Sequence, residues 1–442
     1  MTRISENKII QNKEKFDVLF PQYIKTIEKL QKKYKLSDGS KFNDLVNFKT
    51  NKIIPKHNWY EYKQGYAEEL VKNIIESENP NKKYFILDPF CGVGTTNLVS
   101  QSLGYKSIGF DINPVAFLAS DVKTHYFTST EVKLIKKGIK NFKPTKSSPL
   151  LGVVPKVITS SFDKKSLDSL YKIKYYWENI IDGEYVQKFF KLSYLSIIED
   201  CSLKTKDGNG IKLNLKKKKI DDVFNYYINK CNSMLSDIET SNLNIECEFI
   251  HGSITIEKYF DKVKNKKVSL SIFSPPYANC FDYCEVYKLE FWMGGFVENY
   301  DDFSKYRSIA MRSHVNSKFD HKIINYQKDV DLISETISTF NIWNKNIPDM
   351  IRGYFDDTYE LLKNIKKLLL KDAKVFIVVA NSGYKGILVP TDLLISEIAN
   401  NIGYKVNKIY HARKIRSSSQ QMKDLHLEYD NLMRESIIEL QN

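Results

Sequence analysis

The sequence lacks the marks of several protein classes. Its six cysteines are scattered among 442 residues without a CxxC pair, which argues against a zinc site or a disulfide framework and fits a reducing cytosol. No stretch approaches the roughly 18 apolar residues of a membrane-spanning helix, and Met1–Lys15 is too polar for a signal peptide. We therefore expect a cytoplasmic protein without membrane contacts. The seven histidines show no paired spacing, so no metal site is predicted.

The composition contains an excess of positive charge. Lys and Arg number 67 against 53 Asp and Glu, a formal net charge of +14, which favours polyanionic partners, nucleic acid first. Richness in Lys, Asn, Ile and Tyr is also typical of AT-rich genomes, so charge alone identifies no partner. Hydrophobic residues make up 42% of the chain, enough for a sizeable core. The length indicates two or three domains, or one large domain with insertions.

The chain changes character along its length, and we predict five segments. Helical periodicity near the N-terminus indicates an arm packed on the main body. An alternation of strands and helices begins later, is interrupted by a mostly helical stretch, and then resumes. The segments are 1–50, the N-terminal helical arm; 51–120, the first part of the catalytic core, which binds the cofactor; 121–244, a helical insertion and candidate target-recognition region; 245–415, the second part of the core, with an irregular insertion near 297–345; and 416–442, a C-terminal tail.

The first alternating unit runs from Tyr84 to Asp111. Tyr84–Leu87 is an apolar run typical of a buried strand, and a glycine-containing loop, Asp88–Gly94, follows it. Thr95–Leu103 is predicted to be helical, and Lys106–Phe110 to be a second strand that ends at Asp111. This order opens a doubly wound α/β fold. Further strands are expected at Ile245–Ile250, Val268–Phe273, Val375–Val379 and, as the last strand, Lys405–His411, with helices at Phe355–Leu370 and Thr391–Asn401.

The glycine loop permits close approach of backbone to a ligand. Gly92 and Gly94 lack Cβ atoms, and an acid at the end of the next strand, Asp111, is placed to bind a ribose diol. Asn97 occupies the third small position of G-x-G-x-x-G. By itself this spacing fits a dinucleotide, S-adenosylmethionine, or no more than a tight turn.

A second motif, Ser274-Pro275-Pro276-Tyr277, follows the strand Val268–Phe273. Ligands of open parallel sheets bind beyond the carboxyl ends of the strands. A Pro-Pro step is stiff and lacks backbone donors, so it presents carbonyl oxygens. A hydroxyl, a carbonyl and an aromatic face together suit a planar base with an exocyclic amine. The tetrapeptide alone could equally be a surface turn with a packed tyrosine.

Together these motifs resemble the amino-methyltransferases of DNA, in particular their N4-cytosine branch. Asp88–Thr96 matches the family's cofactor motif, and Ser274–Tyr277 matches its catalytic motif in the form typical of cytosine-N4 enzymes. Adenine-N6 enzymes usually carry Asp or Asn at the first position of that motif. His57–Gly65 resembles the upstream motif that borders the methionine end of the cofactor. The resemblance continues through Asn279–Trp292 and Arg352–Gln421, and it implies a Rossmann-like methyltransferase sheet.

The resemblance also implies S-adenosylmethionine as cofactor and a set of residues that hold it. The family's third motif should be His251-Gly252-Ser253. Many relatives carry an Asp where Ser253 stands, and that acid contacts the adenine amine, so the role of Ser253 is an open point. The expected cofactor-binding residues are Tyr60, Lys63, Gly65, Asp88, Phe90, Cys91, Gly92, Gly94, Thr95, Thr96, Asp111, Ile112 and Ser253.

The expected chemistry is methyl transfer to an amine, without a metal. Ser274 Oγ and the Pro275 carbonyl would hold the two N–H groups of cytosine N4, within a loop stiffened by Pro276, so that its lone pair faces the methyl group. Tyr277 would stack on the flipped-out base. Methylation at cytosine C5 needs a cysteine nucleophile, usually in a Pro-Cys pair, and the sequence has none. Cys91 is expected to be packed in the loop.

DNA contacts are expected from the insertion and from the irregular stretch. Residues 121–250 contain 22 Lys, no Arg and 16 Asp and Glu, which gives 22 − 16 = +6. Lysines suit phosphate contacts, and Lys216, Lys217, Lys218 and Lys219 are the candidates, although such a run can also be a solvated loop. Base readout is assigned to Asn and Gln side chains or to Arg307 and Arg312.

We therefore predict a site-specific methyltransferase of cytosine N4 in double-stranded DNA, with a cognate restriction endonuclease as the expected partner at the same site. The alternatives are an adenine-N6 DNA enzyme and an RNA amino-methyltransferase, because guanine-N2 enzymes of tRNA carry a similar loop. A further alternative, from another class, is a non-catalytic nucleic-acid-binding subunit that kept the fold.

Overall fold

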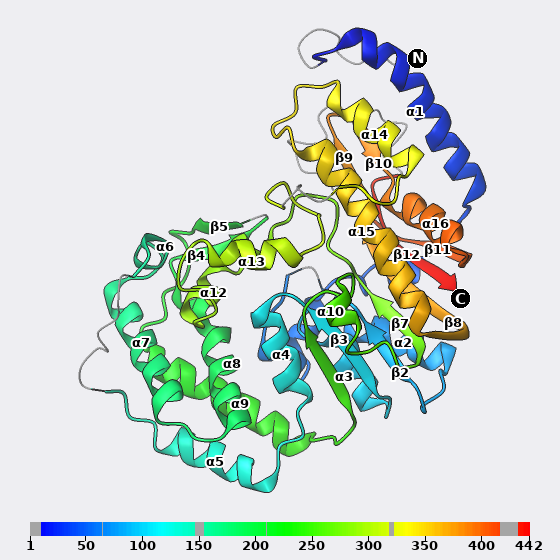
Figure 1. Ribbon diagram of the computed structural model, residues 1–442. Helices are drawn as coiled ribbons and strands as arrows, with labels where there is room; N and C mark the ends of the chain where they lie inside the picture. Colours follow the sequence, from blue (N-terminus) through cyan, green and yellow to red (C-terminus); the bar gives the residue numbers. More distant parts are fainter. Residues whose placement is uncertain (1–9, 64, 146–153, 209, 318–321, 416–431) are drawn as a thin grey trace.

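The molecule is built around one large mixed sheet (Figure 1). The computed structural model describes residues 10–63, 65–145, 154–208, 210–317, 322–415 and 432–442. Within them the sheet has eight strands in the order β1-β11-β12-β8-β7-β2-β3-β6. In that order the strands are Leu36–Asp38, Lys405–Lys414, Arg434–Gln441, Leu369–Ala380, Val268–Phe273, Phe85–Asp88, Ser107–Asp111 and Cys247–His251.

The strands from β8 to β6 run parallel, and β12 is the antiparallel member between β8 and β11. The predicted doubly wound α/β class is confirmed. The prediction that Lys405–His411 is the last strand is wrong, because β12 lies in the expected tail. Its charged residues hid it: Arg434 and Glu435 are buried through ion pairs with Asp392 and Arg413.

Helices cover both faces of the sheet. On one face, Ile86 and Ile272 pack with residues of α2 (Glu68–Glu78), next to α3 (Thr95–Ser102). On the other, Leu87 and Phe273 share a core with α15 (Ile347–Leu368) and α16 (Thr391–Ile402). Successive strand residues thus point to opposite faces, as the pleat requires.

The N-terminal segment joins this body through a helix and a strand. Helix α1 (Lys13–Lys33) lies along α14 (Lys328–Ser338), and Tyr34 donates a hydrogen bond of 2.6 Å to Glu397. Strand β1 extends the sheet by pairing with β11. The stretch 297–345, expected to be irregular, contains α14 and also α13 (Asp302–Ile309), so that expectation is wrong for these two ranges.

The insertion forms a helical body with its own hydrophobic core, seen at the lower left of Figure 1. Its core is completed by α11 and α12, which follow the catalytic motif in the sequence. The helices of this region are α4 (Pro114–Thr124), α5 (Ser129–Lys140), α6 (Lys156–Thr159), α7 (Lys164–Asn179), α8 (Glu184–Cys201), α9 (Val223–Thr240), α11 (Tyr283–Val286) and α12 (Lys288–Met293), and the strands of its hairpin are β4 (Lys204–Asp207) and β5 (Gly210–Leu213).

A few short elements complete the fold. In the described ranges, no helix is long and apolar enough to cross a bilayer. The same ranges contain no group of three or more potential metal ligands. The short elements are η1 (Ser40–Phe42), η2 (Lys49–Ile53), η3 (His57–Trp59), α10 (Glu257–Phe260) and the hairpin strands β9 (Ser382–Tyr384) and β10 (Ile387–Val389).

Candidate active site

The two sequence motifs meet at one edge of the sheet. Strand β2 lies between β3 and β7, with Leu87 opposite Ile108 on one side and Ser271 on the other. The chain therefore leaves β2 toward one side of the sheet, while β7 lies on the other. Such a switch point opens a crevice at the carboxyl ends of the strands, and both the glycine loop and the Ser-Pro-Pro-Tyr loop border it.

The glycine loop depends on two left-handed residues. Gly92 and Gly94 have φ angles of +52° and +79°, which glycine adopts without strain. A Cβ atom on Gly92 would lie 3.2 Å from the ring of Tyr62, and one on Gly94 would lie 3.1 Å from Ser120. Neither position in the loop therefore has room for a side chain.

Asp88 stabilises this loop through hydrogen bonds on the side away from the pocket. One carboxylate oxygen accepts a 2.9 Å hydrogen bond from Phe90 N, and the other accepts one of 2.9 Å from the Tyr66 hydroxyl, which also lies 2.5 Å from Thr96 Oγ1. Burial raises the pKa of Asp88 to about 6. Asp88, Gly94 and Thr96, predicted as cofactor contacts, support the loop and do not line the pocket.

Asp111 lies at the centre of the crevice. Its carboxylate accepts hydrogen bonds from Gly92 N at 2.8 Å and from Asn113 N at 2.7 Å, which fix it between the glycine loop and the start of α4. Burial raises its pKa to about 7, although these hydrogen bonds oppose the rise. Each carboxylate oxygen retains a second lone pair, so the group can still accept hydrogen bonds from a diol.

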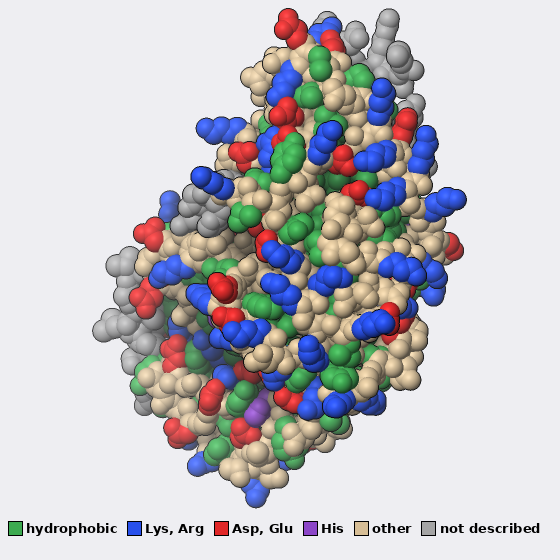
Figure 2. All heavy atoms as spheres, turned by 45° about the vertical axis from the view of Figure 1, so that its right-hand side comes forward, with side chains coloured by type: hydrophobic (Ala, Val, Ile, Leu, Met, Phe, Trp, Pro, Cys, Tyr) green, Lys and Arg blue, Asp and Glu red, His purple; other side chains and the backbone are tan. Residues whose placement is uncertain are grey.

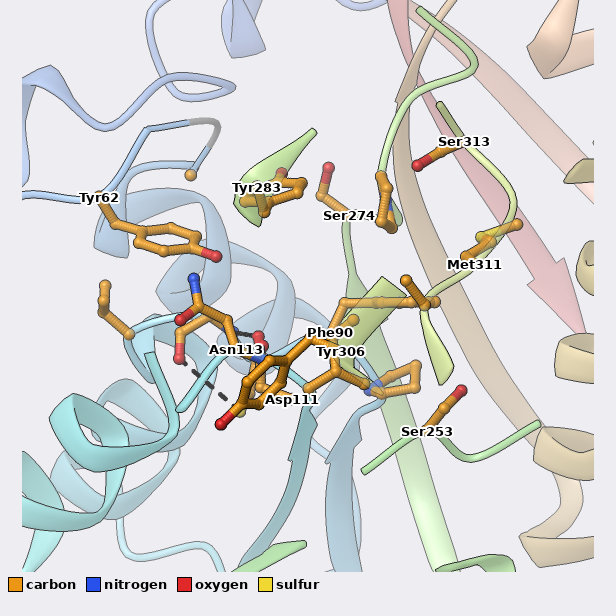
Figure 3. A pocket seen from close by; sticks show the side chains of 18 of the residues that line it. Tyr62, Phe90, Asp111, Asn113, Ser253, Ser274, Tyr283, Tyr306, Met311 and Ser313 are labelled. Carbon is orange, nitrogen blue, oxygen red and sulfur yellow. Dashed lines mark hydrogen bonds between the residues drawn. The ribbon is translucent and has the colours of Figure 1, made fainter. Parts of the chain in front are cut away.

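The crevice forms a pocket that residues of both motifs line. Figure 3 shows Asp111 and Asn113 facing it from one end, Tyr62 and Tyr283 from above, and Ser274 between them and the other wall. The predicted cofactor residues that line it are Gly65, Phe90, Cys91, Gly92, Thr95, Asp111, Ile112 and Ser253, joined by Ser274 and Pro276 of the catalytic motif.

Two residues of the upstream motif lie outside this pocket. The Tyr60 hydroxyl donates to buried Glu290 at 3.2 Å, and Lys63 Nζ donates to the Lys206 carbonyl at 2.6 Å. Their polar atoms are held by α12 and by β4 of the insertion, so the prediction that they contact the cofactor is not supported. Tyr62 lines the pocket instead, stacked on Tyr287 with ring centroids 5.0 Å apart. The run of aromatic residues in the upstream motif is the sequence signal that could have identified Tyr62.

The catalytic motif is anchored from β12. Ser274 Oγ lies 3.5 Å from the Tyr277 hydroxyl, which donates to Glu435 at 2.5 Å, and Arg413 donates to the same carboxylate at 2.6 Å. Burial and the neighbouring Glu435 raise the pKa of Tyr277 well above its ordinary value, so the phenol stays a donor. Among the described residues, the Ser274 hydroxyl makes only this long contact, which leaves it available to a substrate.

One wall of the pocket is formed by residues that were not among the predicted site residues. Tyr306, Met311, Ser313 and His314 line it, and Figure 3 shows Met311 and Ser313 on the side opposite Asp111. Asp282 also lines the pocket and accepts hydrogen bonds from Arg307 at 2.9 Å and Asn316 at 3.1 Å. The residues from Tyr306 to His314 follow no spacing pattern, so only the folded chain shows that they border the pocket.

The two arginines expected to read bases are occupied within the protein. Arg312 is 7% exposed and forms hydrogen bonds of 2.7 Å with Asp356 and 2.6 Å with Asp357. Arg307 pairs with Asp282 and Glu285. Because Nε and Nη2 of both side chains are engaged by carboxylates within the protein, neither presents a free fork to guanine, which weighs against the expected base readout by Arg307 and Arg312.

The lysine run 216–219 divides into two kinds of side chain. Lys217 is partly buried, with Nζ donating to the carbonyls of Glu199 and Lys204, and Lys219 lies 3.3 Å from Asp163. Lys216 and Lys218 are exposed. Elsewhere, Lys and Arg side chains are spread over the face shown in Figure 2 with acidic residues among them, rather than gathered in one patch.

The pocket fits S-adenosylmethionine. It offers a buried carboxylate for a ribose diol at Asp111, glycine backbone without Cβ atoms, and aromatic walls at Tyr62 and Phe90. Such pockets, mostly apolar with a few placed polar groups, are typical of cofactor sites. The thiol of Cys91 is packed against Ser120 at 3.8 Å and burial raises its pKa well above the ordinary value, so it is no nucleophile.

Comparison with known proteins supports this interpretation. A family profile described as DNA methylase matches residues 5–120. The type II methyltransferase M.BsoBI of Geobacillus stearothermophilus is 30% identical to the chain, and the match covers 89% of the chain and 88% of that protein. M.AvaI of Anabaena variabilis is 24% identical, with 86% of each protein covered, and M.MvaI of Kocuria varians is 22% identical, with 87% of the chain and 88% of that protein covered.

A solved rRNA methyltransferase, aviRa from Streptomyces viridochromogenes, aligns with 89% of the chain and 92% of its own at 8% identity and a TM-score of 0.31, too low to support an inference. The identity with M.BsoBI, in contrast, extends over nearly the full length of both proteins, and the site contains the parts that methyl transfer from S-adenosylmethionine requires. The chain belongs to the type II DNA methyltransferases of restriction–modification systems, and S-adenosylmethionine is its methyl donor.

Proposed function

We propose that the protein methylates the exocyclic N4 amine of a flipped-out cytosine in double-stranded DNA, in the cytoplasm, as the modification enzyme of a restriction–modification system. The observation that carries this proposal is the serine at the first position of the catalytic motif, Ser274, at the mouth of the cofactor pocket. A hydroxyl there can accept a hydrogen bond from an amine without adding a charge to the pocket.

The proposed catalysis rests on positioning. S-adenosylmethionine, when bound, supplies a methyl group already activated by a sulfonium. Ser274 Oγ and the Pro275 carbonyl accept hydrogen bonds from the two N–H groups of cytosine N4, which directs the nitrogen lone pair out of the ring plane. Acceptors placed in this way can provide much of the rate enhancement.

The cofactor is proposed to be held by the pocket-lining part of the predicted set. Asp111 accepts hydrogen bonds from the ribose hydroxyls, and Ser253, whose Oγ lies 2.8 Å from Thr255 Oγ1, faces the adenine. The backbone of the loop from Phe90 to Thr95 borders the methionine part. Lys216, Lys218 and Lys219 are exposed, but Lys219 pairs with Asp163, so Lys216 and Lys218 are the remaining candidates for phosphate contacts.

One experiment tests the proposal. DNA methylated by the purified protein is digested to nucleosides, and the product is identified by mass. N4-methylcytosine is expected. N6-methyladenine as the dominant product would overturn the argument from Ser274, and methylation of RNA alone would overturn the substrate. Sequencing the same DNA gives the recognition site, against which a nuclease encoded nearby can be assayed as the proposed partner.

A further inference from the structure

A small recess adjoins the cofactor pocket. It shares Ser274 and Tyr283 with the larger pocket, so a group bound against it would lie next to the cofactor. Three of its residues lie beyond the catalytic motif: Asn279, Phe281 and Tyr283.

The loop that carries Asn279 is fixed on both sides. The Ala278 carbonyl accepts a 2.6 Å hydrogen bond from the Tyr384 hydroxyl, and Cys280 N donates to the Ser313 carbonyl at 3.1 Å. Cys280 has a φ angle of +66°, a region that residues with a Cβ adopt only when the surroundings enforce it. Asn279 is therefore held at one position against the motif.

The orientation of the Asn279 amide follows from its own hydrogen bond. Phe281 N donates to Asn279 Oδ1 at 3.3 Å. Only the oxygen of an amide can accept from an N–H, so the oxygen faces the backbone and the amine group Nδ2 faces away from it. Within the part of the chain that the structure describes, no residue accepts a hydrogen bond from Nδ2.

We propose that Asn279 is a specificity-determining residue that recognises the target cytosine by donating hydrogen bonds from Nδ2 to its N3 and O2. These two atoms are neighbouring acceptors on the edge of the ring. Thymine presents an N–H at N3, and adenine presents a single acceptor, N1, beside a C–H, so neither offers the same pair. The inference rests on the proposed function, because it assumes that cytosine is the base methylated.

The first test replaces the amine without disturbing the turn. Asn279→Asp keeps the oxygen that accepts from Phe281 N and replaces the donor with an acceptor. Asn81→Asp is the matched control, because Asn81 Oδ1 accepts from Lys83 N at 2.9 Å in the same kind of turn, at the opposite edge of the sheet. We expect kcat/KM for DNA to fall about 10- to 100-fold in Asn279→Asp, the range of one lost hydrogen bond, with unchanged cofactor affinity by calorimetry. The control should match the wild type.

The second test uses DNA whose target cytosine is replaced by 3-deazacytosine, which has a C–H in place of N3. The wild type should methylate this DNA more slowly than ordinary DNA, and Asn279→Ala should discriminate less between the two. Equal discrimination by both proteins, or an undiminished kcat/KM in Asn279→Asp, would overturn the inference. If Asn279→Ala melts below the assay temperature, Asn279→Ser provides the same comparison.

The product identified by mass separates the two claims. N6-methyladenine would overturn both the proposed function and this inference. N4-methylcytosine together with unchanged discrimination would overturn only the role of Asn279.

Discussion

The two halves of the molecule treat charge in opposite ways. The sheet half buries ion pairs: Arg434 and Asp392 are 1% and 0% exposed in their side chains and lie 2.8 Å apart. The helical insertion keeps most of its lysines at the surface, where they meet nearby acids, as Lys212 meets Asp207 at 2.7 Å with both side chains more than half exposed. Lys206, buried against Glu290, is an exception.

The difference distinguishes buried ion pairs, which fix the structure around them, from exposed ion pairs, which do not. A buried ion pair tolerates one geometry, since losing one partner leaves an unpaired charge in a poorly solvated place. An exposed pair contributes little and rearranges freely. The net charge of the insertion therefore does not locate a DNA interface, whereas a buried pair such as Arg434 with Asp392 fixes two side chains to each other.

The largest expected effect is on stability, from Arg312→Ala. This change leaves Asp356 and Asp357 without their buried partner, and we expect a loss of about 3–5 kcal/mol in the free energy of unfolding, measured by denaturant titration. The control, Arg352→Ala, removes a more exposed pair with Asp331 and should cost about 1 kcal/mol or less. A small effect of Arg312→Ala would remove the contrast between the two halves.

A smaller effect, on chemistry alone, is expected from Ser274→Ala. The single-turnover rate of methyl transfer should fall about 100-fold, as when one placed hydrogen-bonding group is removed, because N4 loses an acceptor. Cofactor affinity and melting temperature should be unchanged. Ser269→Ala, at the other end of the same strand, is the control. An unaffected rate in Ser274→Ala would show that the hydroxyl does not contact the amine.

Asp111→Ala should weaken cofactor binding by about 1–3 kcal/mol, the worth of a hydrogen bond to a charged group. Calorimetry measures the affinity directly. Because the carboxylate also accepts from Gly92 N and Asn113 N, the variant should melt earlier as well. Asp261→Ala, an exposed acid, is the control, and an unchanged affinity in Asp111→Ala would exclude this residue from the cofactor site.

The pH dependence of the wild type tests the same residue. Burial raises the pKa of Asp111 from 3.8 to about 7, so protonation should weaken cofactor binding as pH falls from 8 to 6. The sign for stability is the opposite. A raised pKa in the folded state contributes stability below pH 3.8 that is lost as pH rises through about 7. Asp111→Asn should lack the slope in cofactor binding and show a smaller slope in stability, because Asp88, whose pKa burial raises to about 6, remains. Parallel binding slopes in the two proteins would assign that slope to another group.

The smallest effect concerns the lysine run, and it sharpens the comparison. The double change Lys216→Ala, Lys218→Ala should weaken binding to any DNA and reduce the slope of log affinity against log salt by up to about 0.9 for each lost phosphate contact. The change Lys217→Ala, Lys219→Ala removes side chains already paired within the protein and should alter the slope less. Equal slopes in all three proteins would place the backbone contacts elsewhere.

The sequence predicted the parts of the fold that follow local patterns. The strand, glycine loop, helix and second strand from Tyr84 to Asp111 lie where apolar runs and glycines indicated, because each depends on neighbouring residues. Strand β12 was missed because alternation of buried ion-pairing residues with apolar ones does not resemble a buried strand, although Arg434 and Glu435 are both buried.

The site was predictable only as far as its motifs extend. Gly92, Asp111 and Ser274 line one pocket as expected. From the motif, Tyr60 and Lys63 were predicted to contact the cofactor. Their polar atoms instead form hydrogen bonds with Glu290 and with the Lys206 carbonyl, partners that lie far away in the sequence. The wall at Met311 and Ser313 could not be foreseen, because its position is set by the buried pair of Arg312 with α15.

Strand β12 also bears on how the protein matures. Residues 434–441 pair with β8 on one side and β11 on the other, although both neighbours are synthesised earlier. Until β12 emerges from the ribosome, β8 and β11 present unpaired edges, which are prone to associate with other chains. Because Glu435 on β12 also receives the Tyr277 hydroxyl, the catalytic loop acquires this anchor only then. We expect nascent chains to remain inactive and dependent on chaperones until this late strand is in place.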